Sequence, residues 1–483
     1  MAKRIHLIGA CGTAMASLAG MLQAAGHRVT GSDAAAYPPM SDLLAGLGIP
    51  LMQPYAAANL EPPPDLVIVG NAISRGNVEL EHVLDTRIPF TSMAAVLHEE
   101  FLASRERLVV AGTHGKTTTT SMLAWIYETA SRMQPEFAAS FLIGGVAENF
   151  GTSFMVRPLK DGIRQPFILE GDEYDTAFFD KGPKFLHYFP DAAILTHVEF
   201  DHADIYPDLT AVKTAFKRLV NLVPRRGRVV AFDGSENVSE CVARAFCAVE
   251  RYGFGLESHW RIADMRVISS NGGGGGSRWT LLRAGQPFAE LTLPMAGEHN
   301  ALNATAAAAL AAGQGVPAEA IVEALGSFKS VKRRLEVRAE IGGVTIIDDF
   351  AHHPTAIRET LRALRTAYPD RRLWAVLEPR SNTLRRNVFE EALVESLALA
   401  DRSVLAAVFK SEAIPEGERL HPEAVVAALR ARGQESALEN DADAIVAKIA
   451  PELRAGDVVA ILSNGGFGGI YEKLPKALAS LHS

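Results

Sequence analysis

The chain has little of three features that would assign it to particular classes of protein. Its three cysteines, Cys11, Cys241 and Cys247, are too few and too scattered among 483 residues for a disulfide framework or a zinc site. Its formal net charge of −8 argues against a nucleic-acid partner, which would need a basic stripe. No apolar run approaches the ~20 residues of a membrane span, and the first residues show no secretory leader. We therefore expect a cytoplasmic protein with no nucleic-acid and no membrane partner.

What remains is the composition of an ordinary globular protein, with 48% hydrophobic and 22% charged residues. A length of 483 residues predicts about three domains, because a domain usually has ~100–200 residues. Strand-like and helix-like segments alternate along the chain, which favours the α/β class with parallel sheets. We expect a Rossmann-like domain over residues 1–105, a phosphate-loop ATPase domain over 106–328 and a second Rossmann-like domain over 329–483.

The most informative segment is residues 108–123, where a strand-like run breaks into Gly-Thr-His-Gly-Lys-Thr and a helical pattern follows. Glycines of such a loop let backbone N–H groups surround a polyphosphate, and the helix N-terminus adds a favourable dipole. Lys116 supplies charge for the outer phosphates, and the Thr117 hydroxyl is suited to ligate Mg²⁺. The loop is two residues shorter than the usual Gly-x4-Gly-Lys-Thr spacing, but the pattern still predicts a nucleotide phosphate site.

The first segment begins like a dinucleotide-binding unit. Gly9 and Gly12 follow a strand-like run, Ser32 and Asp33 end the next strand about twenty residues later, and Asn71 follows a third strand at 66–69. Ligands of open parallel sheets lie at the carboxyl ends of the strands. The glycine fingerprint is incomplete, so both an NAD site and a site for a nucleotide diphosphate remain open.

Carboxylates and a histidine gather after two strands of the second segment. Glu170, Asp172 and Glu173 follow the strand at 167–169, and a second group at 199–204 contains Asp201 and His202. Oxygen ligands next to a phosphate loop are what a Mg²⁺–ATP site needs. Later in this segment, a run of glycines at 272–276 predicts a hairpin tip between two strands.

Two more groups complete the candidate residues. Asn300 and Asn303 lie one turn apart at the start of an alanine-rich helix, where they are either ligand contacts or helix caps. In the third segment, strands end in residues 348–355, with Asp348 and Asp349, in residues 378–383 and in residues 463–469. The pair Arg333–Arg334 lies at the junction before it, where domain closure could bring an arginine onto a phosphate.

Taken in order, these motifs resemble the Mur ligase family of ATP-dependent, amide-forming enzymes of peptidoglycan metabolism. The resemblance covers essentially the whole chain and rests on residues 112–118, 170–173, 199–204, 297–303, 333–336 and 348–355. It implies an ADP-forming ligase with ATP and Mg²⁺ as cofactors.

The resemblance implies a role for each matching residue. It implies Lys116, Arg334 and His202 as catalytic residues and Thr117, Glu170 and His202 as metal ligands. It implies ATP contacts from Gly112, Thr113, His114, Gly115, Lys116, Thr117, Thr118, Asn300, Asn303, Arg334 and one or both of Asp348 and Asp349. It implies UDP-sugar contacts from Gly9, Gly12, Ser32, Asp33 and Asn71, and we add Arg380, Ser381 and Asn382 as peptide contacts, because arginine suits a bidentate carboxylate partner.

Within the family, residues 177–181, 378–383 and 463–470 look like the versions found in ligases that recycle murein peptides. This similarity implies that the chain joins UDP-N-acetylmuramate to L-alanyl-γ-D-glutamyl-meso-diaminopimelate. The main alternative is the biosynthetic ligase that adds L-alanine to the same UDP-sugar. An NAD-dependent oxidoreductase and a non-enzymatic ATP-driven switch are weaker alternatives, because they leave the acidic strand ends unexplained. We expect a monomer or weak homodimer, and His352 or His353 is a possible base for the attacking amine.

Overall fold

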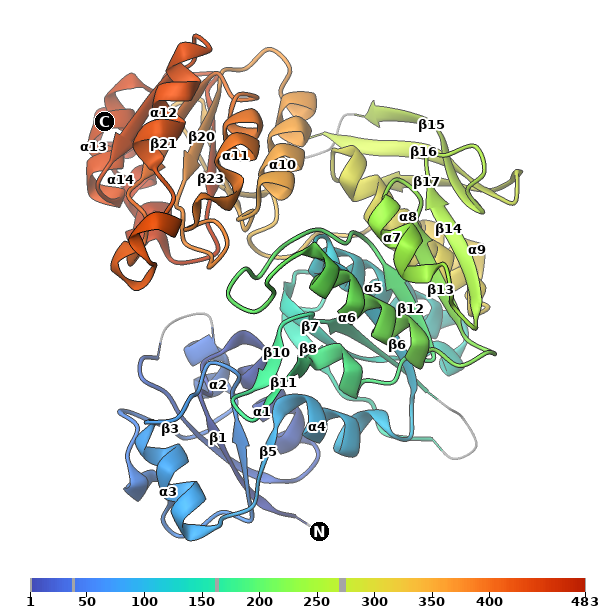
Figure 1. Ribbon diagram of the computed structural model, residues 1–483. Coiled ribbons are helices and arrows are strands. Elements are labelled where there is room, and N and C mark those ends of the chain that lie inside the picture. The colour runs from blue at the N-terminus through green and yellow to red at the C-terminus, as the bar shows by residue number, and fades with distance from the viewer. Residues whose placement is uncertain (1, 37–39, 161–164, 269–274, 483) are drawn as a thin grey trace.

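The computed structural model describes residues 2–36, 40–160, 165–268 and 275–482. Three sheets, each accompanied by helices, follow one another along the chain (Figure 1). The first lies within residues 4–92, the second within 106–293 and the third within 336–462. The expected α/β class with three parallel-type sheets is confirmed, while the boundaries at 105/106 and 328/329 stay a prediction.

The first sheet has five parallel strands in the order β3-β2-β1-β4-β5. Its strands are β1 (Arg4–Ile8), β2 (Arg28–Ser32), β3 (Leu51–Met52), β4 (Leu66–Val69) and β5 (Phe90–Ser92). The helices are α1 (Thr13–Ala24), α2 (Met40–Gly46), α3 (Val78–Thr86) and α4 (Met93–Leu97). Because the chain order reverses beside β1, the carboxyl ends of β1 and β4 form the crevice in which open sheets bind ligands.

The second sheet has ten strands in the order β17-β16-β15-β14-β13-β12-β6-β9-β7-β8. The strands are β6 (Glu106–Ala111), β7 (Ser140–Ala147), β8 (Thr152–Met155), β9 (Pro166–Gly171), β12 (Ala192–Leu195), β13 (Arg228–Phe232), β14 (Ala248–Gly253), β15 (Trp260–Ile268), β16 (Gly276–Arg283) and β17 (Gln286–Leu293). The helices are α5 (Lys116–Met133), α6 (Leu209–Leu222), α7 (Glu236–Val242), α8 (Glu298–Gly313) and α9 (Ala318–Gly326). The parallel pairs β12/β6 and β6/β9 bring the loops after these three strands to one sheet edge.

Two features of this second body match the sequence pattern closely. The alanine-rich helix α8 is buried along nearly its whole length against α5, because alanines allow close approach of two helices. The antiparallel pairing of β15 with β16 confirms the predicted hairpin, although most of its glycine tip lies outside the described residues.

A short hairpin of β10 (Asp175–Ala177) and β11 (Asp180–Pro183) reaches the first body. The rings of Phe178 and Phe179 at its turn lie 6.2 and 5.3 Å from the ring of Phe90, measured between centroids. Residues 177–181, which resemble the recycling ligases, therefore contribute to the contact between the first two bodies.

The third sheet has six strands in the order β18-β19-β23-β20-β21-β22, parallel except for the edge pair β18/β19. The strands are β18 (Glu336–Ile341), β19 (Val344–Asp349), β20 (Leu373–Leu377), β21 (Arg402–Ala406), β22 (Glu435–Glu439) and β23 (Val458–Leu462). The helices are α10 (Pro354–Ala367), α11 (Glu390–Leu397), α12 (Pro422–Ala431), α13 (Ala442–Ile449) and α14 (Ile470–His482). Since β19, β23 and β20 are adjacent and parallel, their three polar loops lie together at one edge.

Across the described ranges, no helix has the length and apolarity needed to cross a membrane.

Candidate functional site

The phosphate loop predicted from sequence joins β6 to α5. Gly112 and Gly115 both have positive φ, and a Cβ at Gly115 would lie 2.5 Å from the Asn303 side-chain oxygen. The Lys116 ammonium folds back to donate to the Gly112 carbonyl oxygen at 2.8 Å. The loop therefore has the backbone conformation of an anion cradle, with its lysine held inside it.

Glu173 anchors two of the predicted catalytic residues. Its carboxylate, 1% exposed, accepts from Lys116 Nζ at 2.7 Å and contacts His202 Nε2 at 3.1 Å. Burial alone would raise the pKa of Glu173, but the Lys116 and His202 charges outweigh burial and hold that pKa at about 2. Burial would lower the pKa of His202, and the same carboxylate raises it to about 9. We did not predict Glu173 as a site residue, although it stands within the motif at 170–173.

Glu170 and Thr117, two predicted metal ligands, lie side by side. The Thr117 hydroxyl donates to Glu170 Oε2 at 3.1 Å, and the Gly144 backbone N–H donates to the other carboxylate oxygen. Burial, with the nearby charge of Asp172, raises the pKa of Glu170 to about 7. A half-buried carboxylate that lacks a full cationic partner fits a hard divalent cation.

His202 fits the metal role less well in this arrangement. A metal ligand must offer a neutral imidazole nitrogen, whereas the contact with Glu173 favours the imidazolium form of His202. Its catalytic and metal roles stay predictions.

Two cavities border the phosphate loop. The inner pocket, about 390 Å³, is lined by residues from all three bodies, among them Gly12, Asn71, Lys116, Glu170, His202 and Arg334. The rear pocket, about 550 Å³, is lined by residues that include His114, Gly115, Thr118, Asn300, Asn303, Arg334 and Asp349. Arg334 lines both cavities, with its guanidinium carbon 5.2 Å from the Phe350 ring centroid. Both volumes suit small-molecule ligands, which usually occupy ~300–1,000 Å³.

The two asparagines do not cap their helix. Helix α8 begins after Gly297 without a side-chain cap, and Asn300 instead donates its amide to the Ala296 carbonyl oxygen at 2.8 Å. Asn303 lies against Gly115 of the phosphate loop. The alternative that they are helix caps is therefore wrong for this structure, and both line the rear pocket.

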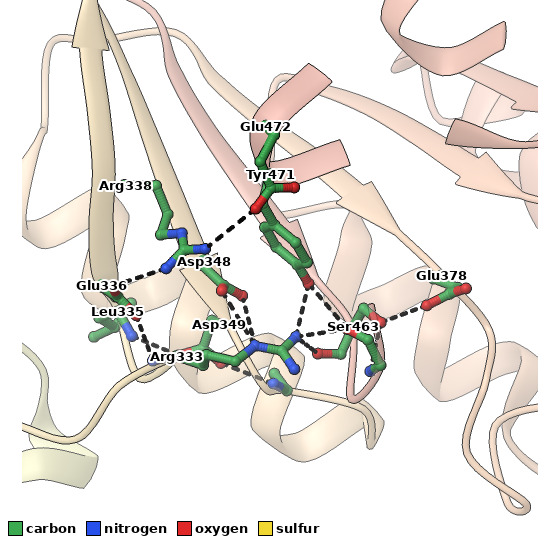
Figure 2. A network of polar contacts seen from close by, with 12 residues as sticks. Arg333, Leu335, Glu336, Arg338, Asp348, Asp349, Glu378, Ser463, Tyr471 and Glu472 are labelled. Carbon is green, nitrogen blue, oxygen red and sulfur yellow. Dashed lines mark hydrogen bonds and ion pairs between the residues drawn. The ribbon is translucent and has the colours of Figure 1, made fainter. Parts of the chain in front are cut away.

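The structure separates the two neighbouring acids at the end of β19 (Figure 2). Asp348, 0% exposed, pairs with Arg333 at 3.2 Å, and burial raises its pKa to about 6 despite that partner. The Arg333 guanidinium also donates to the Ser463 carbonyl and to the Tyr471 hydroxyl, both at 2.7 Å. Asp349 accepts from the Leu335 backbone N–H at 2.8 Å and lines the rear pocket. Asp348 is thus occupied by a structural ion pair, and Asp349 is the acid that faces a cavity.

Only part of the predicted UDP-sugar set reaches the inner pocket. Gly12 and Asn71 line it. Asp33 instead accepts the Cys11 backbone N–H at 2.8 Å, which fixes the loop after β1. The Ser32 hydroxyl, fully buried, donates to Glu79 and lies 3.1 Å from His6 Nε2.

The remaining predicted residue of this set, Gly9, has a φ of 83° and donates its backbone N–H to the Ser32 carbonyl at 2.9 Å. In this conformation Gly9, Ser32 and Asp33 shape the loop after β1, while their direct contact with a ligand stays a prediction.

The phosphate loop also touches the third body. His114 Nε2 lies 3.1 Å from Glu199 Oε2, which also accepts the Thr355 hydroxyl at 2.6 Å. Nearby, His353 Nε2 lies 3.2 Å from the Phe200 carbonyl oxygen, and its Nδ1 accepts from the Thr355 N–H at 3.3 Å. Burial lowers the pKa of His353 to about 4, so that the ring is neutral and tied into this contact. Both His352 and His353 line the inner pocket, and the role of either as the base stays a prediction.

A third cavity, the outer pocket of about 370 Å³, holds the predicted peptide residues Arg380, Ser381 and Asn382. Ser381 donates to the His352 carbonyl at 3.1 Å, and Asn382 donates to Asp204 at 2.7 Å. Arg380 lies over the Phe409 ring and 3.4 Å from Glu378. Of these three side chains, Arg380 has the most N–H donors that are not used in hydrogen bonds to the described protein and can bind a ligand.

Comparisons with known proteins agree with this architecture. Models of the Mur ligase family catalytic domain, the Mur ligase middle domain and the Mur ligase glutamate ligase domain match residues 4–105, 110–311 and 333–465. The chain is 43% identical to the UDP-N-acetylmuramate–L-alanyl-γ-D-glutamyl-meso-2,6-diaminoheptanedioate ligase of Escherichia coli K12, over 99% of this chain and 98% of that one.

Two further relatives complete the comparison. A UDP-N-acetylmuramate–L-alanine ligase of Variovorax paradoxus is 32% identical, over 99% of this chain and 96% of the relative. The crystal structure of a murein peptide ligase from Psychrobacter arcticus is 37% identical and covers 99% of both chains with a TM-score of 0.73.

Proposed function

This chain belongs to the Mur ligase family, and we propose that it joins UDP-N-acetylmuramate to L-alanyl-γ-D-glutamyl-meso-diaminopimelate with ATP, in the recycling of murein peptides. The observation that carries the proposal is the inner pocket, where Asn71, Lys116 and Arg334 come together from three bodies. The greater identity to tripeptide ligases than to the L-alanine ligase supports the choice of substrate.

In this proposal the nucleotide occupies the rear pocket and its phosphates reach round the loop into the inner pocket. Asn300, Asn303 and Asp349 face the nucleoside, and the backbone of residues 112–118 surrounds the phosphates. The Lys116 ammonium keeps a contact with Glu173 while it binds the outer phosphates of the nucleotide. Arg334 lines both pockets and therefore lies on the path of the transferred phosphoryl group.

The residues present fit Mg²⁺ because Thr117 and the half-buried Glu170 offer adjacent oxygen ligands. The ion, when bound, neutralises phosphate charge. The protein's own contribution to phosphoryl transfer is positioning and charge neutralisation by Lys116 and Arg334.

The chemistry follows from these positions. The muramate carboxylate attacks the γ-phosphorus of ATP, which forms an acyl phosphate and releases ADP. The free amine of the peptide then attacks the acyl carbon, and collapse of the tetrahedral intermediate releases phosphate and leaves the amide. Contacts of the third body with residues 199–201 close the pocket, which protects the acyl phosphate from water. We propose that this occurs in the cytoplasm, in a monomer or weak homodimer.

The test is phosphate release from ATP with UDP-N-acetylmuramate and Mg²⁺, with either the tripeptide or L-alanine as amine donor. We expect release with the tripeptide and a product of the mass of the conjugate. Phosphate release with L-alanine but not with the tripeptide would show that the protein is the biosynthetic L-alanine ligase. Phosphate release with neither amine donor would contradict the proposal.

A further inference from the structure

The outer pocket opens beside the inner pocket. Asp201, His202, His352 and Asn464 line both cavities, so the two are neighbours. Arg385 and Lys410, which we did not predict as site residues, line the outer pocket. An amine donor whose nucleophile lies in the inner pocket therefore extends toward Arg385 and Lys410.

One aromatic ring holds two cations of this pocket in place. The Arg380 guanidinium carbon lies 3.8 Å from the Phe409 ring centroid, and the Lys410 ammonium nitrogen lies 5.4 Å from the same centroid. The Phe409 backbone N–H donates to the Pro379 carbonyl at 3.1 Å, which fixes the ring beside the loop after β20. Cation–π contacts of this kind orient a charge without neutralising it.

The positive charges of Arg380, Arg385 and Lys410 are only weakly neutralised by acidic side chains of the protein. Arg380 meets Glu378 only at 3.4 Å, and the Arg385 Nη1 bonds to the Phe409 and Lys410 carbonyls are equally long. The Arg385 Nη2 donates to the Asn382 side-chain oxygen at 2.5 Å, while its buried Nε has no hydrogen-bond partner. Within the described part of the chain, no ion pair is found for Lys410.

Among the described residues, Asp201 is the one acid that lines the outer pocket. Asp201 accepts the Thr383 hydroxyl at 2.6 Å and the His202 backbone N–H at 2.7 Å. Asp204, which accepts the Asn382 amide, and Glu412 lie outside the lining, and both lie near enough to Arg385 to interact with its charge. The lining of the outer pocket therefore carries three cations, Arg380, Arg385 and Lys410, against the one carboxylate of Asp201, and this excess of positive charge suits an anionic ligand.

We propose that Arg385 and Lys410 form a subsite for the carboxylates of the peptide that are remote from its reacting amine. The inference rests on the proposed function. The tripeptide carries three carboxylates, one on its D-glutamyl residue and two on diaminopimelate, whereas L-alanine carries one. Three cations, Arg380, Arg385 and Lys410, lie around Phe409, which equals the number of carboxylates on the tripeptide. The guanidinium of Arg385 is planar and can donate two parallel hydrogen bonds to one carboxylate.

Within the subsite, Lys410 is the contact for the outermost carboxylate. Its side chain lines the outer pocket and is exposed, and its backbone has a φ of 48°, which a lysine seldom adopts. An extended tripeptide spans ~10 Å, so that its third residue lies far from the acyl carbon. The carboxylate at the far end of diaminopimelate is the group that L-lysine lacks at the same position.

This difference gives a matched pair of substrates. For Lys410→Gln we expect kcat/KM with the diaminopimelate tripeptide to fall roughly tenfold, mainly through KM, because a charge-assisted contact is lost. With L-alanyl-γ-D-glutamyl-L-lysine we expect a change of less than about twofold, because that peptide lacks the carboxylate. Lys410→Arg keeps the charge and should keep the preference, and Lys476→Gln, on an exposed position of α14, should behave as the unaltered protein.

The outcomes separate this inference from the proposed function. An active protein in which Lys410→Gln lowers kcat/KM equally for both peptides, or for neither, would overturn the subsite and leave the function standing. If the unaltered protein makes no conjugate with either peptide, peptide binding is measured by calorimetry. Tighter binding of the diaminopimelate peptide than of the lysine peptide, lost in Lys410→Gln, would then support the subsite while the function fails, and equal binding would overturn it.

Discussion

The inner and outer pockets differ in how their charges are balanced. In the inner pocket, Lys116 and His202 share the buried carboxylate of Glu173, and Thr117 bonds to Glu170. In the outer pocket, Arg380, Arg385 and Lys410 have long contacts or none with acids of the described chain. The inner pocket is thus organised before any ligand arrives, whereas the outer pocket depends on its ligand for charge balance.

This difference corresponds to two tasks. Stabilising charge in a phosphoryl transfer requires donors fixed in advance, because their reorganisation would otherwise add to the barrier. Selecting an anionic peptide requires cations whose charge is satisfied only by the correct substrate. Four substitutions test this division, beginning with the largest expected effect.

Lys116→Ala removes the central charge of the inner pocket. We expect kcat to fall about a thousandfold or more, because a preorganised cation at the transferred phosphoryl group is lost. Circular dichroism should show a folded chain with reduced stability, since Glu173 then remains buried with His202 as its charged partner. Lys476→Ala, at an exposed position of α14, is the control. Preserved turnover in Lys116→Ala would refute the phosphate-loop assignment.

Glu173→Gln tests whether the inner pocket is organised by this one carboxylate. We expect kcat to fall about ten- to a hundredfold, as for other residues that orient catalytic groups. The pKa of His202 should fall from about 9 toward its ordinary value, because the partner that raises it is gone. Imidazole signals followed by NMR across pH measure that pKa, and an unchanged value would show that Glu173 does not control His202.

Glu199→Gln tests the contact through which the third body meets the phosphate loop. Burial would raise the pKa of Glu199, but His114 and Thr355 hold it at about 2. Since this is below the unfolded value of ~4.3, the carboxylate stabilises the fold above pH ~4.3, and the gain is lost as pH falls toward 2.

At pH 7 we expect Glu199→Gln to lower the free energy of unfolding by about 1–2 kcal/mol, allowing for partial exposure of Glu199. The difference from the unaltered protein should shrink as pH falls from ~4.3 toward 2 in urea titrations, because the carboxyl group of the unfolded chain is protonated first and that of the folded chain only near pH 2. If the difference in the free energy of unfolding between the two proteins did not change with pH, the contact assigned to the Glu199 carboxylate would be wrong.

Ser381→Ala should have the smallest effect. Its hydroxyl is used between the His352 carbonyl and the Leu384 N–H, so that its loss should disturb the loop slightly without removing a ligand contact. We expect KM to rise no more than about threefold, equally for the diaminopimelate and lysine peptides. If KM rose for only one of the two peptides, Ser381 would contact the peptide directly, and the proposed subsite would no longer consist of Arg385 and Lys410 alone.

The sequence predicts the inner and rear pockets well for a simple geometric reason. Lys116 and Thr117 follow β6, Glu170 lies near the carboxyl end of β9, and the carboxyl ends of these parallel strands meet at one edge. Asn303 is predictable in the same way, because it lies one helical turn from Asn300 on α8. Local patterns of strand, loop and helix are enough to bring these residues together.

Contacts that depend on side-chain direction or on docking of separate bodies are not predictable in this way. Nothing local shows that Asp348 pairs with Arg333 while Asp349 faces a cavity, because the two differ only by the alternation of one strand (Figure 2). Ser32 appears as a ligand contact in sequence, yet Glu79, 47 residues away, takes its hydroxyl. Lys410 reaches the outer pocket through the loop after β21, for which the sequence gives no motif.

The most direct test of the two-pocket account is positional isotope exchange in ATP labelled with ¹⁸O at the β,γ-bridge, in the presence of UDP-N-acetylmuramate and Mg²⁺ but no peptide. Reversible formation of the acyl phosphate would scramble the label between the bridge and the β-phosphate oxygens. The account predicts scrambling that requires the UDP-sugar and is lost in Lys116→Ala, because the inner pocket is organised without the peptide. Scrambling that appears only when the tripeptide fills the outer pocket would contradict it.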